Sequence, residues 1–297
     1  MSRDETLLCI VGPTASGKSS LALRLASDLG GEIISADSMQ IYRGFDIGTG
    51  KPSAAEQAQV PHHFVDVAEP LEAWDAAQWA SQASARIAEI RGRGRLPIVC
   101  GGTFLWVRAL IYGLADAPRG DESLRKRHRE LAETEGRAAL HQKLAQVDPP
   151  SAARLAPNDF VRVSRALEVF ELSGKPMSQV QAEHGFRQPR FAARLVGVKR
   201  ERDEHDALIE KRVRAMLQSG LVSEVQALIA RGFAETRVMQ SVGYRQVFEA
   251  LAAGTAGDET ALAEAIVRAT RVFARRQRTW LRDQPVEWLP ADATKLP

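Results

Sequence analysis

The stretch GPTASGKS, residues 12–19, has the spacing of a phosphate-binding loop. It follows an apolar run and precedes a helical pattern, so its backbone N–H groups and the start of that helix can surround an anion. A lysine in such a loop bridges terminal phosphates, and the hydroxyl that follows it ligates Mg²⁺. We therefore predict a phosphate site, with Ser19 as the Mg²⁺ ligand. Its residues are Gly12, Pro13, Thr14, Ala15, Ser16, Gly17, Lys18 and Ser19.

The acid that accompanies this loop in ATP-hydrolysing proteins is missing from its usual place. Those proteins end a nearby apolar strand with Asp or Glu, which holds Mg²⁺. Here the apolar run LPIVCG, 96–101, leads into GGT, and the acid follows a different run, at Asp37. Asp37 can face an acceptor as a general base, or it can cap a turn as Asp often does after a strand. Both interpretations stay open.

Short apolar runs alternate with helical patterns in the first part of the chain. Strands are expected at 7–12, 32–36, 63–67 and 96–101, and a helix at 74–91. Such alternation is typical of a parallel sheet with right-handed crossovers. The predicted fold class is α/β, with a P-loop NTPase-like parallel sheet core and a helical insertion domain.

The strand pattern stops near residue 116 and returns at RLVGVK, 194–199. Between them lie helical patterns, one of which starts at PNDF with Asp159 as its predicted N-cap. Later helices are expected at 204–219, 221–231 and 258–282. We predict a catalytic core of residues 1–115 and 195–297 and a helical insertion of residues 116–194.

Bulk properties narrow the class of protein. The chain has 297 residues, a net charge of +3 and 44% hydrophobic residues, and no apolar run reaches the length of a membrane span. Its two cysteines, Cys9 and Cys100, lie inside apolar runs, which indicates buried thiols in a reducing compartment. We expect a cytoplasmic monomer with no membrane partner.

Blocks along essentially the whole chain resemble the tRNA dimethylallyltransferase family of bacterial type. GPTASGKS is similar to the family's phosphate loop, and DSMQIYRGFDIGTGKP, 37–52, is similar to its more specific second signature. Five further blocks match in order. These are PHHFVD (61–66), GGTFLWVRAL (101–110), PNDFVRVSRALEVFELSGKP (157–176), SVGYRQ (241–246) and RRQRTWLR (275–282).

The resemblance implies transfer of a dimethylallyl group from its diphosphate to the N6 amine of the adenosine 3′ of the tRNA anticodon. It implies that the loop holds the donor's diphosphate with Mg²⁺, so ATP is not required. Asp37 would then be the general base. Thr103 would contact the reacting centre or the bridging oxygen, and Arg212 would clamp the diphosphate from the opposite side.

The resemblance also implies contacts with the tRNA anticodon arm. Around the adenine they are Asp37, Ser38, Met39, Gln40 and Thr103. In the insertion they are Arg125, Val161, Arg162, Val163, Ser164 and Arg165, and later in the chain Gln240, Ser241, Val242, Gly243, Tyr244 and Arg245.

The last long helical pattern carries a basic stripe. Arg268, Arg271, Arg275, Arg278 and Arg282 fall on one face, while Leu262, Ile266, Ala269, Phe273 and Trp280 fall on another that should pack on the core. The stripe can face RNA phosphates or be solvated and ion-paired, and both interpretations stay open.

Two other enzymes share the loop chemistry. A small-molecule P-loop kinase needs neither the second signature nor the basic later segments. An adenylate isopentenyltransferase performs the same transfer on a free nucleotide and would lack the insertion. The chain also departs from the family at Phe104 and Trp106, where bulk would narrow the prenyl channel.

Overall fold

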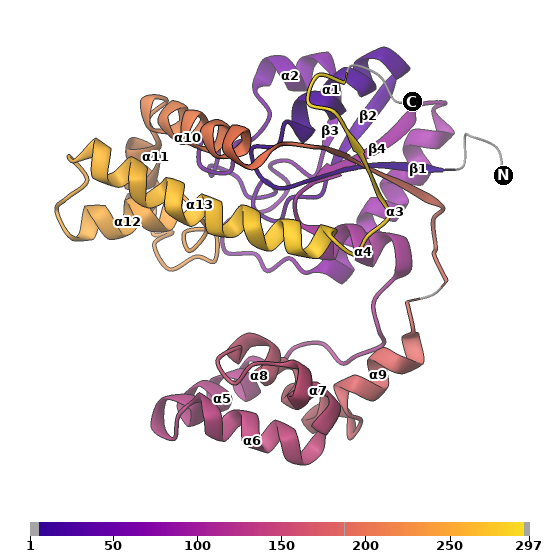
Figure 1. Ribbon diagram of the computed structural model, residues 1–297, viewed down its shortest axis with the longest axis vertical. Helices are drawn as coiled ribbons and strands as arrows, with labels where there is room; N and C mark the ends of the chain where they lie inside the picture. Colours follow the sequence, from indigo (N-terminus) through magenta and orange to yellow (C-terminus); the bar gives the residue numbers. More distant parts are fainter. Residues whose placement is uncertain (1–5, 187, 294–297) are drawn as a thin grey trace. The chain divides into compact units, whose positions relative to one another are not determined.

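The computed structural model describes residues 6–186 and 188–293 (Figure 1). The chain divides into two compact units. The larger unit comprises Met1–Ile111 and Phe191–Pro297, and the smaller one comprises Tyr112–Arg190. The boundaries expected from the sequence lie four residues further along at both ends.

The larger unit is built on a six-stranded sheet in the order β3-β2-β4-β1-β5-β6. Every neighbouring pair of strands is parallel, which confirms the α/β class. The strands are β1 (Leu7–Val11), β2 (Gly31–Ser35), β3 (His62–His63), β4 (Leu96–Gly101), β5 (Ala193–Val198) and β6 (Val286–Leu289). All residues of β1 and β2 are buried, as expected for parallel strands covered on both faces.

Two strands differ from the expectation. The predicted strand at 63–67 is wrong beyond its start, because Phe64 and Asp66 have φ of 64° and 55° and leave the extended region. The edge strand β6 was not predicted. It is four residues long and partly exposed, with Trp288 at 41%, so its apolar signal is weak.

Helices cover both faces of this sheet and extend beyond it (Figure 1). They are α1 (Lys18–Leu29), α2 (Ala54–Gln59), α3 (Ala76–Gly92), α4 (Phe104–Tyr112), α10 (Arg202–Gln218), α11 (Leu221–Ala230), α12 (Tyr244–Ala252) and α13 (Glu259–Leu281). Helix α1 packs on the sheet through Leu21 and Leu25. Helix α13 contacts α10 and α12.

The prediction of which α13 residues pack on the core is partly wrong. Leu262 and Ile266 are buried, but Phe273 and Trp280 are both 42% exposed. Positions 274, 277 and 281 are buried instead, so the inward face holds a glutamine. The helix therefore points a polar side chain toward the sheet edge where the phosphate loop lies.

Only helices occur in the described part of the smaller unit. They are α5 (Glu122–Thr134), α6 (Arg137–Val147), α7 (Pro149–Arg154), α8 (Phe160–Ser173) and α9 (Met177–His184). Leu140, Leu144 and Val163 contribute to its core. Asp159 accepts the N–H of Arg162 as the predicted N-cap of α8.

Candidate active site

The phosphate loop fills the turn from the end of β1 to the start of α1. Ala15 and Gly17 have φ of 61° and 94°, which bends the backbone sharply. Gly12 has no room for a side chain, because a Cβ there would lie 2.8 Å from Ser16 Oγ. The first N–H groups of α1 have no acceptor within the helix and can bind an anion. The buried Ser16 hydroxyl has no hydrogen-bond partner among the described residues.

Lys18 is the first residue of α1 and points back over this loop. Its Nζ donates to the Pro13 carbonyl oxygen at 3.3 Å. Burial lowers the pKa of Lys18, and the guanidinium of Arg212 lowers it further, while Asp37 acts in the opposite direction. These three charged groups, from three separate parts of the sequence, therefore lie in one corner of the larger unit.

Arg212 reaches this corner from α10. One of its terminal nitrogens lies 3.5 Å from the Thr49 carbonyl oxygen. It packs directly on Gly50, where a Cβ would come within 2.1 Å of that nitrogen. Burial lowers the pKa of Arg212, and Asp37 opposes the shift. Gly50, with φ of 61°, is thus the surface on which the guanidinium rests.

Asp37 and Thr103 follow neighbouring strands, β2 and β4, so the sheet brings them to the same edge. The Ser38 N–H donates to Thr103 Oγ1 at 3.0 Å, and the Thr103 N–H donates to Ala36 O at 3.1 Å. One Asp37 oxygen accepts the Met39 N–H at 2.9 Å, so the turn cap is present. No hydrogen bond to its second oxygen is found among the described residues. The cap and the general base are therefore compatible.

The Gln40 amide stabilises the second signature. Its Oε1 accepts from Ser35 Oγ at 3.1 Å, and its Nε2 donates to Gly50 O at 3.0 Å. Both ends of the amide are thus engaged within the protein. The predicted adenine contact is better suited to Ser38 and Met39, which are partly exposed beside Asp37.

Tyr244 was expected to contact RNA, but its side chain is fully buried. Its hydroxyl donates to Glu224 and accepts the Gly48 N–H at 3.1 Å. The Glu224 carboxylate also accepts the Ile47 N–H at 2.8 Å. Tyr244 therefore holds the second signature in place. Gln240 and Arg245 are exposed on either side of it, while Ser241 and Val242 are partly exposed and Gly243 is buried.

In the smaller unit, Arg125 and Arg165 share one carboxylate. Glu168 is fully buried and binds Arg125 Nε at 2.9 Å, the Asp121 N–H at 2.7 Å, and an Nη of Arg165. Arg165 also donates to Pro118 O at 2.6 Å. The side chains of Arg125 and Arg165 are only partly exposed, at 43% and 31%. They are thus fixed side by side.

In the first turn of α8, two exposed residues are followed by two buried ones. Val161 is 75% exposed, and Arg162 lies 3.3 Å from Asp159 at the surface. Val163 and Ser164 were predicted to contact RNA, but both are buried. Ser164 Oγ bonds His128 Nδ1 at 2.9 Å. Side-chain contact with RNA is therefore available to Val161 and Arg162 but not to Val163 or Ser164.

Phe104 and Trp106 are core residues. Both are buried, and Trp106 stacks on Trp79 with ring centroids 5.1 Å apart. The bulk expected to narrow a channel is thus accounted for by packing of α4 against α3.

The donor set at the phosphate loop suits a cation that arrives with phosphate oxygens. No cluster of three or more His, Cys, Asp or Glu able to hold a metal occurs in residues 6–186 and 188–293. Ser19 is exposed in the first turn of α1. Mg²⁺ keeps several waters and is commonly bound by few protein groups together with substrate phosphates, so one hydroxyl beside the loop fits such an ion.

Comparison with known proteins decides the family. The sequence model of the IPP transferase family matches residues 40–284. The chain belongs to this family. The phosphate loop and residues 37–39 precede the matched range, so the match includes the second signature only from Gln40 onward, together with the insertion and the later helices.

Three similar proteins agree with that assignment. A tRNA dimethylallyltransferase of Sorangium cellulosum is 60% identical over 283 residues, covering 95% of this chain and 90% of its own. The crystal structure of the tRNA isopentenylpyrophosphate transferase of Bacillus halodurans is 37% identical, with a TM-score of 0.70 and coverage of 97% and 90%. A eukaryotic dimethylallyltransferase acting on tRNA is 25% identical, with a TM-score of 0.80 and coverage of 97% and 74%. These matches confirm the predicted fold.

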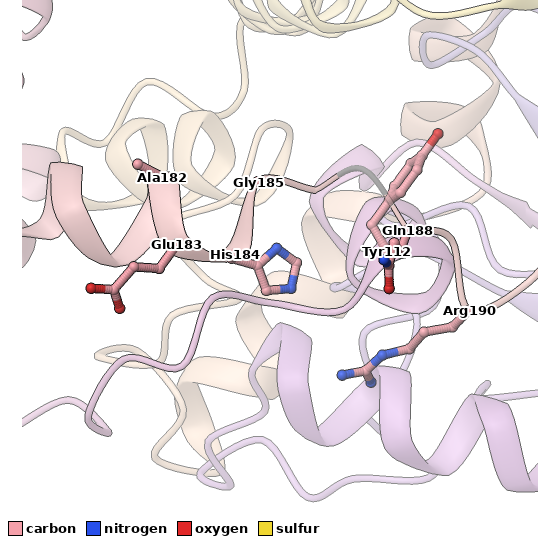
Figure 2. A pocket seen from close by; sticks show the side chains of 7 residues that line it. All are labelled: Tyr112, Ala182, Glu183, His184, Gly185, Gln188 and Arg190. Carbon is pink, nitrogen blue, oxygen red and sulfur yellow. The ribbon is translucent and has the colours of Figure 1, made fainter.

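A separate hollow lies within the smaller unit (Figure 2). It is lined by Tyr112, Ala182, Glu183, His184, Gly185, Gln188 and Arg190. Figure 2 shows the Glu183 carboxylate pointing away from the His184 ring, and Glu183 pairs with Lys175 at 3.4 Å. The lining offers no acid facing the imidazole, and none of the predicted site residues is among it.

None of the helices in the described part of the chain has the length and apolar character needed to cross a bilayer.

Proposed function

We propose that this chain transfers a dimethylallyl group from dimethylallyl diphosphate to the N6 amine of the adenosine 3′ of the tRNA anticodon, releasing diphosphate. One observation carries the proposal. Lys18, Asp37 and Arg212 interact electrostatically at the edge of the sheet where Thr103 lies. They do so in a chain whose relatives are named tRNA dimethylallyltransferases.

The donor half of the site is cationic. The loop amides, Lys18 and Arg212 bind the diphosphate from two sides and stabilise the charge that develops on the bridging oxygen as the carbon–oxygen bond breaks. When bound, Mg²⁺ neutralises phosphate charge, with Ser19 as its protein ligand. Partly buried cations suit this role because their electrostatic effect is stronger away from water.

The acceptor half is anionic. The amine nitrogen forms a bond to the allylic carbon while the diphosphate departs, and the amine must lose one proton in the process. The open Asp37 oxygen accepts that proton as general base. Thr103, held against Ser38, lies beside the reacting centre, and Ser38 and Met39 hold the adenine.

The RNA contacts that we propose are the exposed or partly exposed members of the predicted set. Arg125, Arg165, Arg162 and Val161 contribute from the smaller unit, and Gln240, Ser241, Val242 and Arg245 from the larger one. Arginines fixed by a carboxylate suit phosphate recognition because their planar fork is already oriented. A looped-out base costs less to extrude than a paired one, which suits an anticodon-loop adenosine.

The test follows labelled dimethylallyl diphosphate with Mg²⁺ into bulk tRNA or into AMP in separate tubes. We expect label in tRNA alone. Label in AMP would replace tRNA by a free nucleotide as the acceptor. If neither is labelled and the protein instead transfers phosphate from ATP to a small-molecule acceptor, the loop is that of a kinase and the proposal fails.

A further inference from the structure

Distant helices hold Thr14 of the phosphate loop through both of the peptide groups that flank its Cα. The Thr14 N–H donates to Gln277 Oε1 of α13 at 2.8 Å. The Thr14 carbonyl oxygen accepts from His205 Nε2 of α10 at 2.8 Å. The partners lie 263 and 191 residues away in the sequence, so tertiary packing helps to set the orientation of both peptide groups.

The other end of Gln277 reaches the second loop of the site. Its Nε2 donates to Gly102 O at 3.0 Å, next to Thr103 in the chain. A Cβ at Gly102 would lie 2.4 Å from that nitrogen, so only glycine permits this approach. One amide therefore spans the phosphate loop and the loop that carries Thr103. At 9% exposure, Gln277 is not placed to contact RNA.

The protonation state of His205 follows from its partners. An arginine has no acceptor, so the 2.8 Å contact from Arg278 to His205 Nδ1 requires an unprotonated Nδ1. The proton then lies on Nε2, which donates to Thr14. Burial is the main cause that lowers the pKa of His205, and the nearby Arg278 and Arg200 add to it. Arg278 thus fixes the tautomer that grips the loop.

The orientation of the Thr14–Ala15 peptide, which His205 holds, matters because Ala15 has a left-handed φ of 61°. An L residue seldom takes this conformation without support from its surroundings. If the peptide turned over, the Thr14 carbonyl would leave His205, and a loop that binds anions would present an oxygen where it needs N–H groups. His205 opposes that flip directly, and Gln277 holds the preceding peptide; the two side chains together are called the clamp.

We infer that Gln277 and His205 are positioning residues for the transfer reaction. His205 fixes the Thr14–Ala15 peptide and Gln277 fixes the preceding Pro13–Thr14 peptide, so that the loop amides face the diphosphate. Gln277 also sets the spacing between this loop and Thr103. Neither touches the reacting atoms. The inference rests on the proposed function only for the identity of the donor, because the clamp acts on phosphate binding itself.

The test compares Gln277→Met with Thr279→Ala. Methionine fills a similar volume but makes neither hydrogen bond, whereas Thr279 is exposed on the same helix. Isothermal calorimetry measures inorganic diphosphate binding with Mg²⁺, and kinetics give kcat and the donor KM. For Gln277→Met we expect diphosphate affinity to fall about tenfold and kcat to fall as well, because two partly buried backbone groups lose their partner. The Kd for tRNA and the melting temperature should stay near those of the unaltered protein.

A second pair isolates the imidazole. His205→Leu removes the donor to Thr14, whereas His205→Gln keeps an N–H that can replace it. We expect His205→Leu to weaken diphosphate binding and His205→Gln to restore most of it. The inference is overturned if a folded Gln277→Met protein binds diphosphate and turns over like the unaltered one, or if His205→Gln and His205→Leu are equally impaired. Failure of the proposed function shows separately, as an unaltered protein that labels no tRNA.

Discussion

Two carboxylates, one in each unit of the molecule, have opposite surroundings. Glu168 in the smaller unit is fully buried and binds two arginines and a backbone N–H. Burial alone would raise its pKa, but the hydrogen bonds from Arg165, the Asp121 N–H and Arg125 together hold the pKa of Glu168 below its usual value. Asp37 in the larger unit is partly exposed and accepts one backbone N–H.

The difference separates an organising carboxylate from one that can react. Glu168 has its oxygens occupied, so it fixes its arginines and cannot readily take a proton. Asp37 keeps one oxygen open, and no hydrogen bond joins it to its two cationic neighbours, Lys18 and Arg212, among the described residues. The proposed function assigns both cations to the diphosphate. Substitutions at these groups should therefore have different consequences, one on the chemical step and the other on structure.

The largest effect should come from Asp37→Asn. Loss of a general base typically costs about 10²–10⁴ in rate, so kcat should fall by that order while the protein stays folded. Steady-state transfer to tRNA measures the rate, and a binding assay should show little change in tRNA affinity. Asp28→Asn, at an exposed position of α1, is the matched control. Near-normal turnover by Asp37→Asn would remove Asp37 as the base.

Lys18→Met should affect the donor more than the acceptor. The ammonium is a charge-assisted partner for phosphate, so donor KM should rise by roughly tenfold or more. Calorimetry with inorganic diphosphate gives the same comparison without turnover, and tRNA affinity serves as the internal control. Unchanged diphosphate affinity would mean that the loop binds no phosphate through this side chain.

Glu168→Gln should act on stability instead. Removing one partner of a buried ion pair costs several kcal/mol, and because both arginines are partly exposed we expect about 3 kcal/mol for unfolding of the smaller unit. Glu130→Gln in α5 is the control in the same unit, since the Glu130 side chain is 60% exposed and lies 3.9 Å from Lys126. Surface pairs of that kind contribute about 0–1 kcal/mol. Equal losses for the two variants would contradict the contrast.

The same carboxylate predicts a pH dependence. The pKa of Glu168 in the folded protein is depressed below its value in the unfolded chain, which is about 4.3. Its stabilising contribution is therefore fully present above the unfolded pKa and is lost as the pH falls through the folded pKa. Denaturant unfolding between neutral and acidic pH should show this loss, and Glu168→Gln should lack that component. A parallel pH profile for both proteins would contradict it.

Local patterns in the sequence predict much of this site, but they do not predict the residues that hold its loops in place. The glycine spacing at 12–19 and the acid after β2 are local signals, and sheet geometry then brings Asp37 to Thr103. The sequence does not predict the supporting partners, because Gln277 and Glu224 lie in ordinary helical patterns and bind backbone groups far away in sequence. For Tyr244 the local signal is misleading. Its place in a distinctive sequence block predicts contact with RNA, whereas its buried hydroxyl accepts the Gly48 N–H.

The smallest expected effect distinguishes arginines within the basic stripe of α13. Arg275 is exposed, whereas Arg278 bonds His205 and Arg271 lies 3.4 Å from Asp206. If Arg275 faces a phosphate of the bound RNA, Arg275→Gln should weaken binding modestly and reduce the slope of log K against log salt by about 1. Arg278→Gln should leave that slope unchanged and weaken diphosphate binding instead, because it releases the His205 tautomer.

Nitrocellulose filter binding over a salt series measures the slope, and calorimetry measures diphosphate binding. If the unaltered protein, Arg275→Gln and Arg278→Gln all give the same slope, the stripe is a solvated face. If only Arg278→Gln reduces the slope, the RNA contact is at Arg278 and the prediction for Arg275 is wrong.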